Sequence, residues 1–197
     1  MGEGMGDCGG GAAGLWEAWG VTERSASAPR AVPTGGDGAA ARQPALLEER
    51  YGAAMDRALA LARAAGREGE VPVGAVVLDP GGRVLAEAAN AREAERDPTA
   101  HAEIRALRAA GRALEGSHLD GCSLVVTLEP CTMCAGAIQL ARLARVVLAA
   151  WEPRTGACGS IRDVLRDPRA NHRVEVVAGL RADASAALLT DFFAPRR

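Results

Sequence analysis

Two short motifs place the strongest constraint on the fold of this chain, because their side chains have to meet at one point. His101-Ala102-Glu103 comes first, and Pro130-Cys131-Thr132-Met133-Cys134 begins 27 residues after Glu103. One imidazole and two thiols are ligands of the kind that Zn²⁺ prefers, so His101, Cys131 and Cys134 are the candidate metal ligands. Three protein ligands leave a fourth position for water, which is typical of a catalytic zinc site. The sequence therefore predicts a fold that brings the two motifs together.

Glu103 is not needed to hold the metal, and we expect it to be the catalytic proton shuttle for a zinc-activated water. Both motifs fall at predicted helix starts. In a regular helix His101 and Glu103 would point about 200° apart, so both can face the metal only near a helix end. Cys131 and Cys134 share one face of a first helical turn, where the positive end of the helix favours thiolates.

Each motif alone also fits other kinds of protein. A Cys-x-x-Cys pair occurs in redox proteins and in structural zinc sites, and a histidine or glutamate at a helix start is often a surface residue. A structural site would need a fourth donor, and no candidate forms a second closely spaced pair; the candidates are Cys8, Cys122, Cys158, His118 and His172. The prediction of a catalytic zinc therefore rests on the joint occurrence of the two motifs.

Composition sets wide limits. A chain of 197 residues with no apolar run near the roughly 18 residues of a membrane span indicates one globular domain and no membrane segment. Five cysteines, an odd number, and the lack of a secretory signal pattern favour the reducing cytoplasm. All 23 basic residues are arginine and the net charge is −2, which neither supports nor excludes an RNA substrate.

The chain divides into an extension and a folded part. Residues 1–44 are rich in Gly, Ala, Ser and Pro and have no periodic apolar pattern. We expect this segment to be disordered, or to result from a misassigned translation start. Residues 45–197 are predicted to form the catalytic domain.

The folded part alternates helical and strand patterns, which predicts a three-layer α/β domain around one mixed sheet. Helices are expected from Ala45 to before Gly66, from Asp97 to Ala110, from Cys131 to Leu143 and from Ala182 to Phe193. Strands are expected at Val73–Leu78, Arg83–Ala89, Ser123–Leu128, Arg145–Trp151 and Val174–Val177. Asp79-Pro80-Gly81-Gly82 predicts a hairpin turn that makes the first two strands antiparallel, whereas strands joined through helices should be parallel.

The His-x-Glu and Pro-Cys-x-x-Cys pattern resembles the zinc-dependent nucleobase deaminases. Over residues 50–197 the chain looks like one branch of them, the bacterial tRNA-specific adenosine deaminases. Segments that carry this resemblance are Glu70–Val76, Asp97–Ile104, Val126–Ala137, Arg154–Ser160, Asn171–Glu175 and Asp191–Phe193. The first two also occur loosely in guanine and cytosine deaminases, and the last three discriminate better. The resemblance implies a three-layer α/β/α cytidine-deaminase-like domain with about five strands, one zinc per subunit and a homodimer.

The resemblance also implies the reaction and its partner, which are hydrolytic conversion of adenosine to inosine at the wobble position of a tRNA anticodon stem-loop. Asn90 matches the family residue that hydrogen-bonds the base, and Val73 and the backbone at Ala102 would line the base pocket. Glu152 stands where relatives often carry Asp near the nucleotide. A basic C-terminal end would meet the RNA through Arg196 and Arg197. From the residues alone, Asn90 also reads as a turn residue and the two arginines as a frayed tail.

Other functions remain open at this point. A deaminase of free guanine or cytosine would use the same chemistry on another substrate. A protein of another class, an inactive zinc-binding interaction module, would keep the three ligands without turnover, although the intact Glu103 disfavours it. A redox or structural Cys-x-x-Cys protein would not need the His-x-Glu motif.

Overall fold

The structure is a computed structural model that describes residues 42–196 of the chain. The expected disordered extension, residues 1–44, therefore lies outside the described residues except for its last three positions. Those three begin the first described helix, α3 (Arg42–Arg67), which starts earlier than expected and runs through Gly66. Within residues 42–196, no helix has the length and apolar character needed to cross a membrane.

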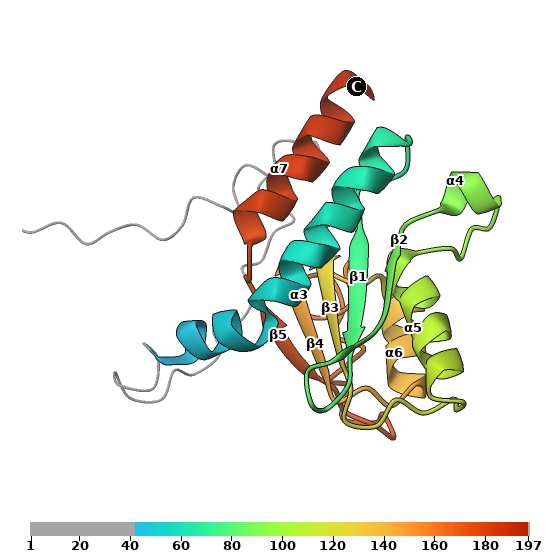
Figure 1. Cartoon of the computed structure of the whole chain (residues 1–197), viewed down its shortest axis with the longest axis vertical. Helices are drawn as coiled ribbons and strands as arrows, with labels where there is room; N and C mark the ends of the chain where they lie inside the picture. The colour runs from blue at the N-terminus through green and yellow to red at the C-terminus, as the bar shows by residue number, and fades with distance from the viewer. Residues whose placement is uncertain (1–41, 197) are drawn as a thin grey trace, which may run out of the picture.

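A five-stranded mixed sheet forms the centre of the domain, with the strand order β2-β1-β3-β4-β5 (Figure 1). Strand β1 lies antiparallel to both β2 and β3, whereas β4 lies parallel to both β3 and β5. The strands are β1 (Gly74–Leu78), β2 (Val84–Ala89), β3 (Ser123–Leu128), β4 (Arg145–Ala150) and β5 (Glu175–Ala178). The predicted mixed sheet and the antiparallel first pair are confirmed. The hairpin turn closes where the Gly82 N–H donates to the Asp79 carbonyl at 2.9 Å.

Helices cover both faces of the sheet, which confirms the three-layer arrangement (Figure 1). Helices α3 and α7 (Ala182–Phe193) pack on one face, and α5 (Ala102–Ala113) and α6 (Thr132–Leu140) pack on the other. Successive side chains of β1 point to opposite faces of the sheet, since Val76 packs against α3 and Val77 packs in the cluster that contains α5 and α6. Central strands buried on both sides cannot alternate polar with apolar residues, and this explains the continuous apolar runs in the sequence.

The expected helix starts and stops on the α5/α6 face differ from those observed. Helix α5 begins at Ala102, because the Asp97 carboxylate accepts hydrogen bonds from the N–H and hydroxyl of Thr99 and holds that segment in a turn. It also continues past Gly111. Helix α6 stops at Leu140, and Arg142 takes a left-handed backbone angle of φ 58° soon after. A short helix, α4 (Arg92–Glu95), was not predicted.

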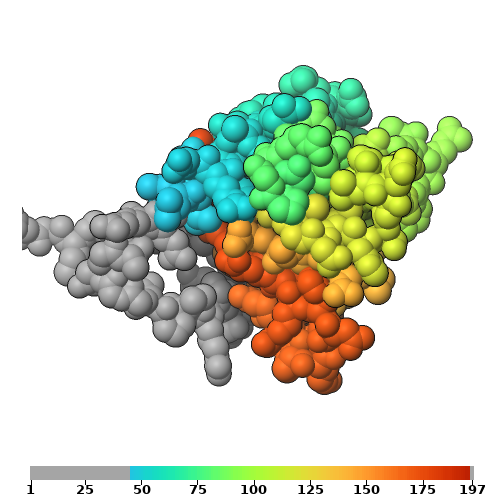
Figure 2. Space-filling view, turned by 60° about the horizontal axis from the view of Figure 1, so that its bottom comes forward, coloured from blue at the N-terminus to red at the C-terminus, as the bar shows by residue number. Residues whose placement is uncertain are grey.

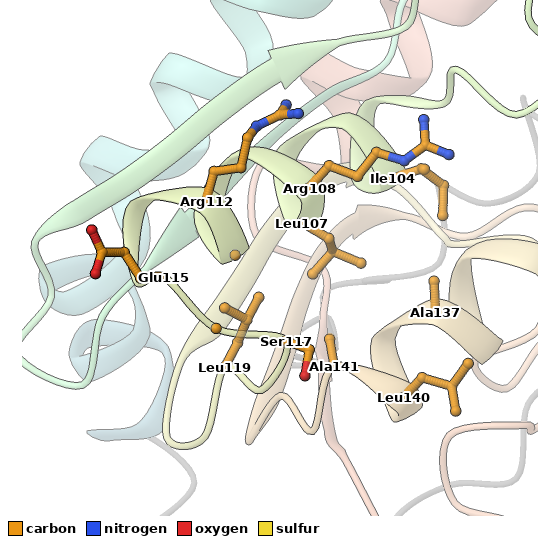
Figure 3. Close-up of a pocket in the computed structure, with 12 residues that line it drawn as sticks. Ile104, Leu107, Arg108, Arg112, Glu115, Ser117, Leu119, Ala137, Leu140 and Ala141 are labelled. Atoms are coloured by element: carbon orange, nitrogen blue, oxygen red, sulfur yellow. The ribbon is translucent and has the colours of Figure 1, made fainter.

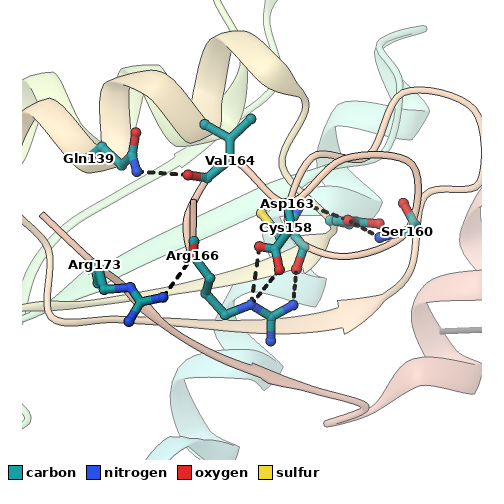
Figure 4. A network of polar contacts seen from close by, with 8 residues as sticks. Gln139, Cys158, Ser160, Asp163, Val164, Arg166 and Arg173 are labelled. Atoms are coloured by element: carbon teal, nitrogen blue, oxygen red, sulfur yellow. Dashed lines mark hydrogen bonds and ion pairs between the residues drawn. The ribbon is translucent and has the colours of Figure 1, made fainter. Parts of the chain in front are cut away.

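The connection between β4 and β5, residues 151–174, has no helix or named strand and projects from the body as an orange lobe in Figure 2. Side chains hold it in place (Figure 4). Gln139 of α6 donates to the Val164 carbonyl at 2.7 Å, and Arg166 donates to both the Asp163 carboxylate and the Cys158 carbonyl. The segment is therefore fixed to the helix that carries Cys134.

Candidate metal centre and active site

The two motifs occupy the first positions of two helices on the same face of the sheet. His101 immediately precedes α5 in an extended conformation, φ −70° and ψ 150°, and Cys131 precedes α6 in a similar one, φ −72° and ψ 175°. Neither side chain caps its own helix by a hydrogen bond. Both side chains are thus available to a shared site, and Cys134 joins them from the first turn of α6.

The three candidate ligands lie at the separations that a tetrahedral zinc requires. His101 Nδ1 is 3.4 Å from Cys134 Sγ and 3.8 Å from Cys131 Sγ, and the two sulfur atoms are 3.7 Å apart. Zn–S bonds of about 2.3 Å and Zn–N bonds of about 2.0 Å at tetrahedral angles place two sulfurs about 3.8 Å apart and a nitrogen and a sulfur about 3.5 Å apart. Within residues 42–196, these three side chains are the ones that converge as a possible metal-binding group. Three protein ligands match a zinc site whose fourth coordination position is open.

The electrostatics of the three groups favour metal binding as well. The pKa of the Cys131 thiol falls to about 4, because it shares a hydrogen bond with Cys134 and lies beside the His101 imidazole. The pKa of Cys134 rises through the same shared bond and through burial. Both sulfurs sit at the positive end of α6, which stabilises a thiolate. One thiolate is therefore available at neutral pH, and a bound metal would displace the proton that the pair shares.

Glu103 is the second residue of α5 and is buried, with 4% of its surface exposed. Burial raises the pKa of its carboxyl group above the ordinary value, and the nearby His101 opposes that shift. Since Glu103 is not one of the three converging ligands, it lies beside the metal group without belonging to it. A buried carboxyl group with a raised pKa can both accept and donate a proton near neutral pH.

A cavity of about 210 Å³ opens in front of these groups. His101, Glu103 and Cys131 line it, together with three of the residues that the sequence singled out for substrate binding, Val73, Asn90 and Glu152. The rest of the wall consists of Val71, Arg92, Leu128, Glu129, Thr155 and Phe193. The volume lies below the roughly 300–1,000 Å³ of pockets for drug-sized ligands, so the cavity suits one small ring system.

The other residues expected at the site are placed differently. Cys134 and Ala102 are both fully buried, and neither is among the residues that line the cavity. Arg196 ends the last short helix, η2 (Ala194–Arg196), and Arg197 lies outside the described residues. Glu152 turns partly back on its own loop, because its Oε1 accepts the Arg154 N–H at 2.8 Å.

Two buried glutamates support the cavity and were not predicted to do so. Glu129 accepts the N–H groups of Glu152, Cys158 and Ser160 at 2.9, 2.8 and 3.1 Å, and it thereby fixes the loop that carries Thr155. Glu70 accepts from the Asn90 side chain and from two N–H groups of α4. Glu129 directly precedes Pro130, and Glu70 lies two residues before Pro72. This closeness to a proline of a motif segment was the one feature of the sequence that could have indicated a role for either glutamate.

Comparisons with known proteins agree with this geometry. Residues 48–150 match the zinc-binding region of the cytidine and deoxycytidylate deaminases. The tRNA-specific adenosine deaminase of Agrobacterium fabrum is 46% identical, over 73% of this chain and 93% of that protein. The tRNA(Ile)-lysidine synthase of Deinococcus deserti is 49% identical over 71% of this chain, which spans only 26% of that longer protein.

Solved structures point the same way. One from work on A-to-I editing by tRNA:A34 deaminases at the wobble position of transfer RNA superimposes with a TM-score of 0.66 and 44% identity, covering 68% of this chain and 97% of that one. A guanine deaminase from Nitrosomonas europaea gives a TM-score of 0.62 at 27% identity, over 87% of this chain and 91% of that one.

Proposed function

The chain belongs to the cytidine and deoxycytidylate deaminase family, within its tRNA-specific adenosine deaminases, and we propose that it converts adenosine to inosine at the wobble position of a tRNA anticodon. The observation that carries the proposal is the arrangement of His101, Cys131 and Cys134 at zinc-binding separations, with Glu103 beside them, at the base of one small cavity. A substrate in tRNA also implies that the protein works in the cytoplasm.

His101, Cys131 and Cys134 would hold the zinc, and Glu103 would remain outside its coordination sphere. A zinc ion in this site supplies a Lewis acid that lowers the pKa of water in the open position. Two thiolates and a neutral imidazole cancel the charge of Zn²⁺, so the ion acidifies water less than it would with three neutral ligands. A base close to that water is therefore required, and Glu103 is the carboxylate in place.

Glu103 would carry protons through the whole reaction. Its carboxylate takes a proton from the attacking water as the oxygen bonds to carbon 6 of the purine. The resulting carboxyl group gives that proton to ring nitrogen 1. Glu103 then passes the proton of the new hydroxyl group on carbon 6 to the amino group, so that the C6–N bond breaks, ammonia leaves and the carbonyl of inosine forms. Burial supports this role, because the raised pKa of Glu103 brings its proton affinity closer to that of its partners.

The cavity walls suit a nucleotide that is splayed out of an RNA loop. Asn90 and Val73, which line the cavity, would contact the base, and Glu152 would lie near the nucleotide. The backbone at Ala102, next to Glu103, would complete the base pocket, although Ala102 is not among the residues that line the cavity. Phe193 lines the cavity as a stacking surface, and the exposed Arg92 can bind a phosphate outside it. Flanking nucleotides would remain outside, and the basic C-terminal residues Arg196 and Arg197 would meet the RNA there.

We also propose that two copies associate through the groove between α5 and α6 (Figure 3). The groove has a volume of about 820 Å³ and is mostly apolar; its walls include Ile104, Leu107, Leu119, Ala137 and Leu140. Leu140 is 80% exposed, and the rim carries both signs of charge through Arg108, Arg112 and Glu115. A two-fold interface pairs a patch with itself, and a rim that carries both signs of charge is compatible with such a pairing.

Sedimentation of two variants tests the homodimer. Leu140→Glu should convert the dimer to a monomer, because it places a charge in the apolar groove. Leu46→Glu is the matched control, since Leu46 is 61% exposed on α3, away from the groove. A wild-type monomer, or dissociation by both variants alike, would contradict this interface.

A substrate panel tests the proposed reaction. One protein sample is incubated separately with an anticodon stem-loop bearing a wobble adenosine, the same stem-loop with a wobble guanosine, free adenosine, guanine and cytosine. We expect inosine from the first substrate only, at a rate that falls as the salt concentration rises. Turnover of guanine or cytosine without change in the stem-loop would support the alternative, a free-base deaminase. Zinc binding with activity on none of them would indicate an inactive zinc-binding module.

A further inference from the structure

Glu70 is a buried carboxylate that the reaction does not use and that contacts two parts of the cavity wall. It lies just before β1 and has 3% of its surface exposed. Its Oε2 accepts a hydrogen bond from Asn90 Nδ2 at 2.9 Å. Its Oε1 accepts the N–H groups of Glu93 and Ala94, in α4, at 2.8 and 2.9 Å. The two carboxylate oxygens therefore bind different groups: Oε1 accepts hydrogen bonds from the backbone of α4, and Oε2 accepts one from the Asn90 side chain.

The bond to Oε2 determines which way round the Asn90 amide sits. A carboxylate accepts hydrogen bonds and an amide can either donate or accept, so the donating NH₂ group has to face Glu70. The backbone N–H of Asn90 is bound to the Val73 carbonyl at 2.9 Å, which fixes the position of the residue itself. Among the described residues no donor reaches Asn90 Oδ1, and Asn90 lines the cavity. The amide oxygen is therefore available to the substrate.

We propose that Glu70 is a positioning residue that fixes the orientation of the Asn90 amide, so that the cavity offers Oδ1 as an acceptor for a donor group on the bound nucleotide. This inference rests on the proposed function for its substrate, although the orientation of the amide does not depend on it. A substrate lacking a donor at that position would leave the buried Oδ1 unpaired, which is the strongest form of discrimination available to a small polar site.

The substitution Glu70→Gln separates orientation from structural support. The glutamine carbonyl oxygen can still accept the two N–H groups of α4, but its NH₂ group replaces Oε2 and faces the NH₂ group of Asn90. Asn90 then has to flip and present its NH₂ group to the cavity. We expect kcat/KM on the stem-loop to fall about 10- to 100-fold, the worth of one mispaired hydrogen bond, with little change in zinc content or Tm. Glu68→Gln, at an exposed neighbouring position, is the matched control.

The double variant Glu70→Gln/Asn90→Asp reverses the pair and keeps its total charge. The introduced glutamine would donate to one carboxylate oxygen of the introduced aspartate, and the other oxygen would again offer an acceptor to the cavity. We expect this double variant to recover activity to within about threefold of wild type, whereas a purely structural role for Glu70 predicts additive losses. Wild-type kinetics in Glu70→Gln, or no recovery in the double variant, would overturn the proposal.

Amide spectra of ¹⁵N-labelled protein test the orientation without any turnover. The Asn90 side-chain resonances are identified by their loss in Asn90→Asp. In wild-type protein one of the two amide protons should exchange slowly because Glu70 holds it, and Glu70→Gln should shift both resonances and remove that protection. Identical Asn90 resonances in the two proteins would refute the inference. A wild-type enzyme that acts on guanine and not on the stem-loop would instead refute the proposed function alone.

Discussion

Replacing Gly156 by alanine should destabilise the protein far more than an ordinary Gly→Ala change. Gly156 lies in the loop after β4 and forms an isolated antiparallel bridge with Cys131. A Cβ atom at this position would lie 2.2 Å from Oε2 of Glu129 and 2.3 Å from Oγ of Ser160. Ordinary contacts between such atoms are about 3.5 Å, so the carboxylate would have to retreat by about 1 Å.

The cost follows from what that carboxylate holds. Glu129 accepts three backbone N–H groups at 2.8 to 3.1 Å, and a retreat of this size stretches at least one of these bonds beyond hydrogen-bonding distance. A hydrogen bond to a charged group is worth about 1.5–3 kcal/mol, and overpacking adds about 1–3 kcal/mol of strain. We therefore expect the free energy of unfolding to fall by about 3–5 kcal/mol, which corresponds to a Tm about 10 °C lower.

Urea unfolding of Gly156→Ala and Gly136→Ala provides the assay. Gly136 lies inside α6, and a Cβ there would meet no atom within 4 Å. Gly136→Ala should therefore stabilise the protein by about 0.5–1 kcal/mol, because alanine favours the helix. The same substitution thus has opposite signs at the two positions. A loss below about 1 kcal/mol in Gly156→Ala, with the control behaving as expected, would refute the role assigned to Glu129.

Three further predictions concern parts of the chain outside the reacting groups. Tyr51→Phe removes the buried hydroxyl that contacts Ser123 and Arg145, the first residues of β3 and β4, at the end of these strands away from the cavity. It should lower the free energy of unfolding by about 1–2 kcal/mol and leave kcat unchanged. Burial raises the pKa of the Glu152 carboxyl group above its ordinary value, so the unfolded chain loses this proton at a lower pH than the folded protein does. The free energy of unfolding therefore falls as the pH rises from the pKa of the unfolded chain through that of the folded protein. Glu152→Gln, which cannot lose a proton, should gain stability relative to wild type as the pH rises, as measured by urea titrations from about pH 4 to 8. A chain beginning at Arg42 should match the full-length protein in Tm and turnover, and a large loss in either would show that residues 1–41 contribute to the domain.

The sequence predicted elements well where local pattern and packing agree. The bounds of β3 and α7 coincide with those observed, because each is a clear apolar pattern between turn signals. The start of α5 was wrong, since Pro98 and Thr99 are helix-start signals and the Asp97 side chain holds them in a turn instead. The order of the strands, with β1 between β2 and β3, has no local signal at all.

The same contrast holds for the site. His101, Cys131 and Cys134 could be predicted because residue type and spacing are sufficient to indicate a metal site. Glu70 and Glu129 could not, since a glutamate in a sequence is usually exposed and only the assembled sheet shows that these two are 3% exposed. Their backbone partners are N–H groups 23 to 31 residues further along the chain, and Glu70 also binds the side chain of Asn90; no periodic pattern reveals these contacts.

The central claim is that Glu103 performs the proton transfers beside a zinc that it does not hold. Zinc content and inosine formation measured on the same sample of Glu103→Gln test this claim most directly. The account predicts about one zinc per chain, as in wild-type protein, with inosine formation reduced at least about 10³-fold, near the upper part of the range for a lost general acid–base. Loss of zinc from the folded variant would show that Glu103 is a ligand, and near wild-type turnover would show that it is not the proton shuttle.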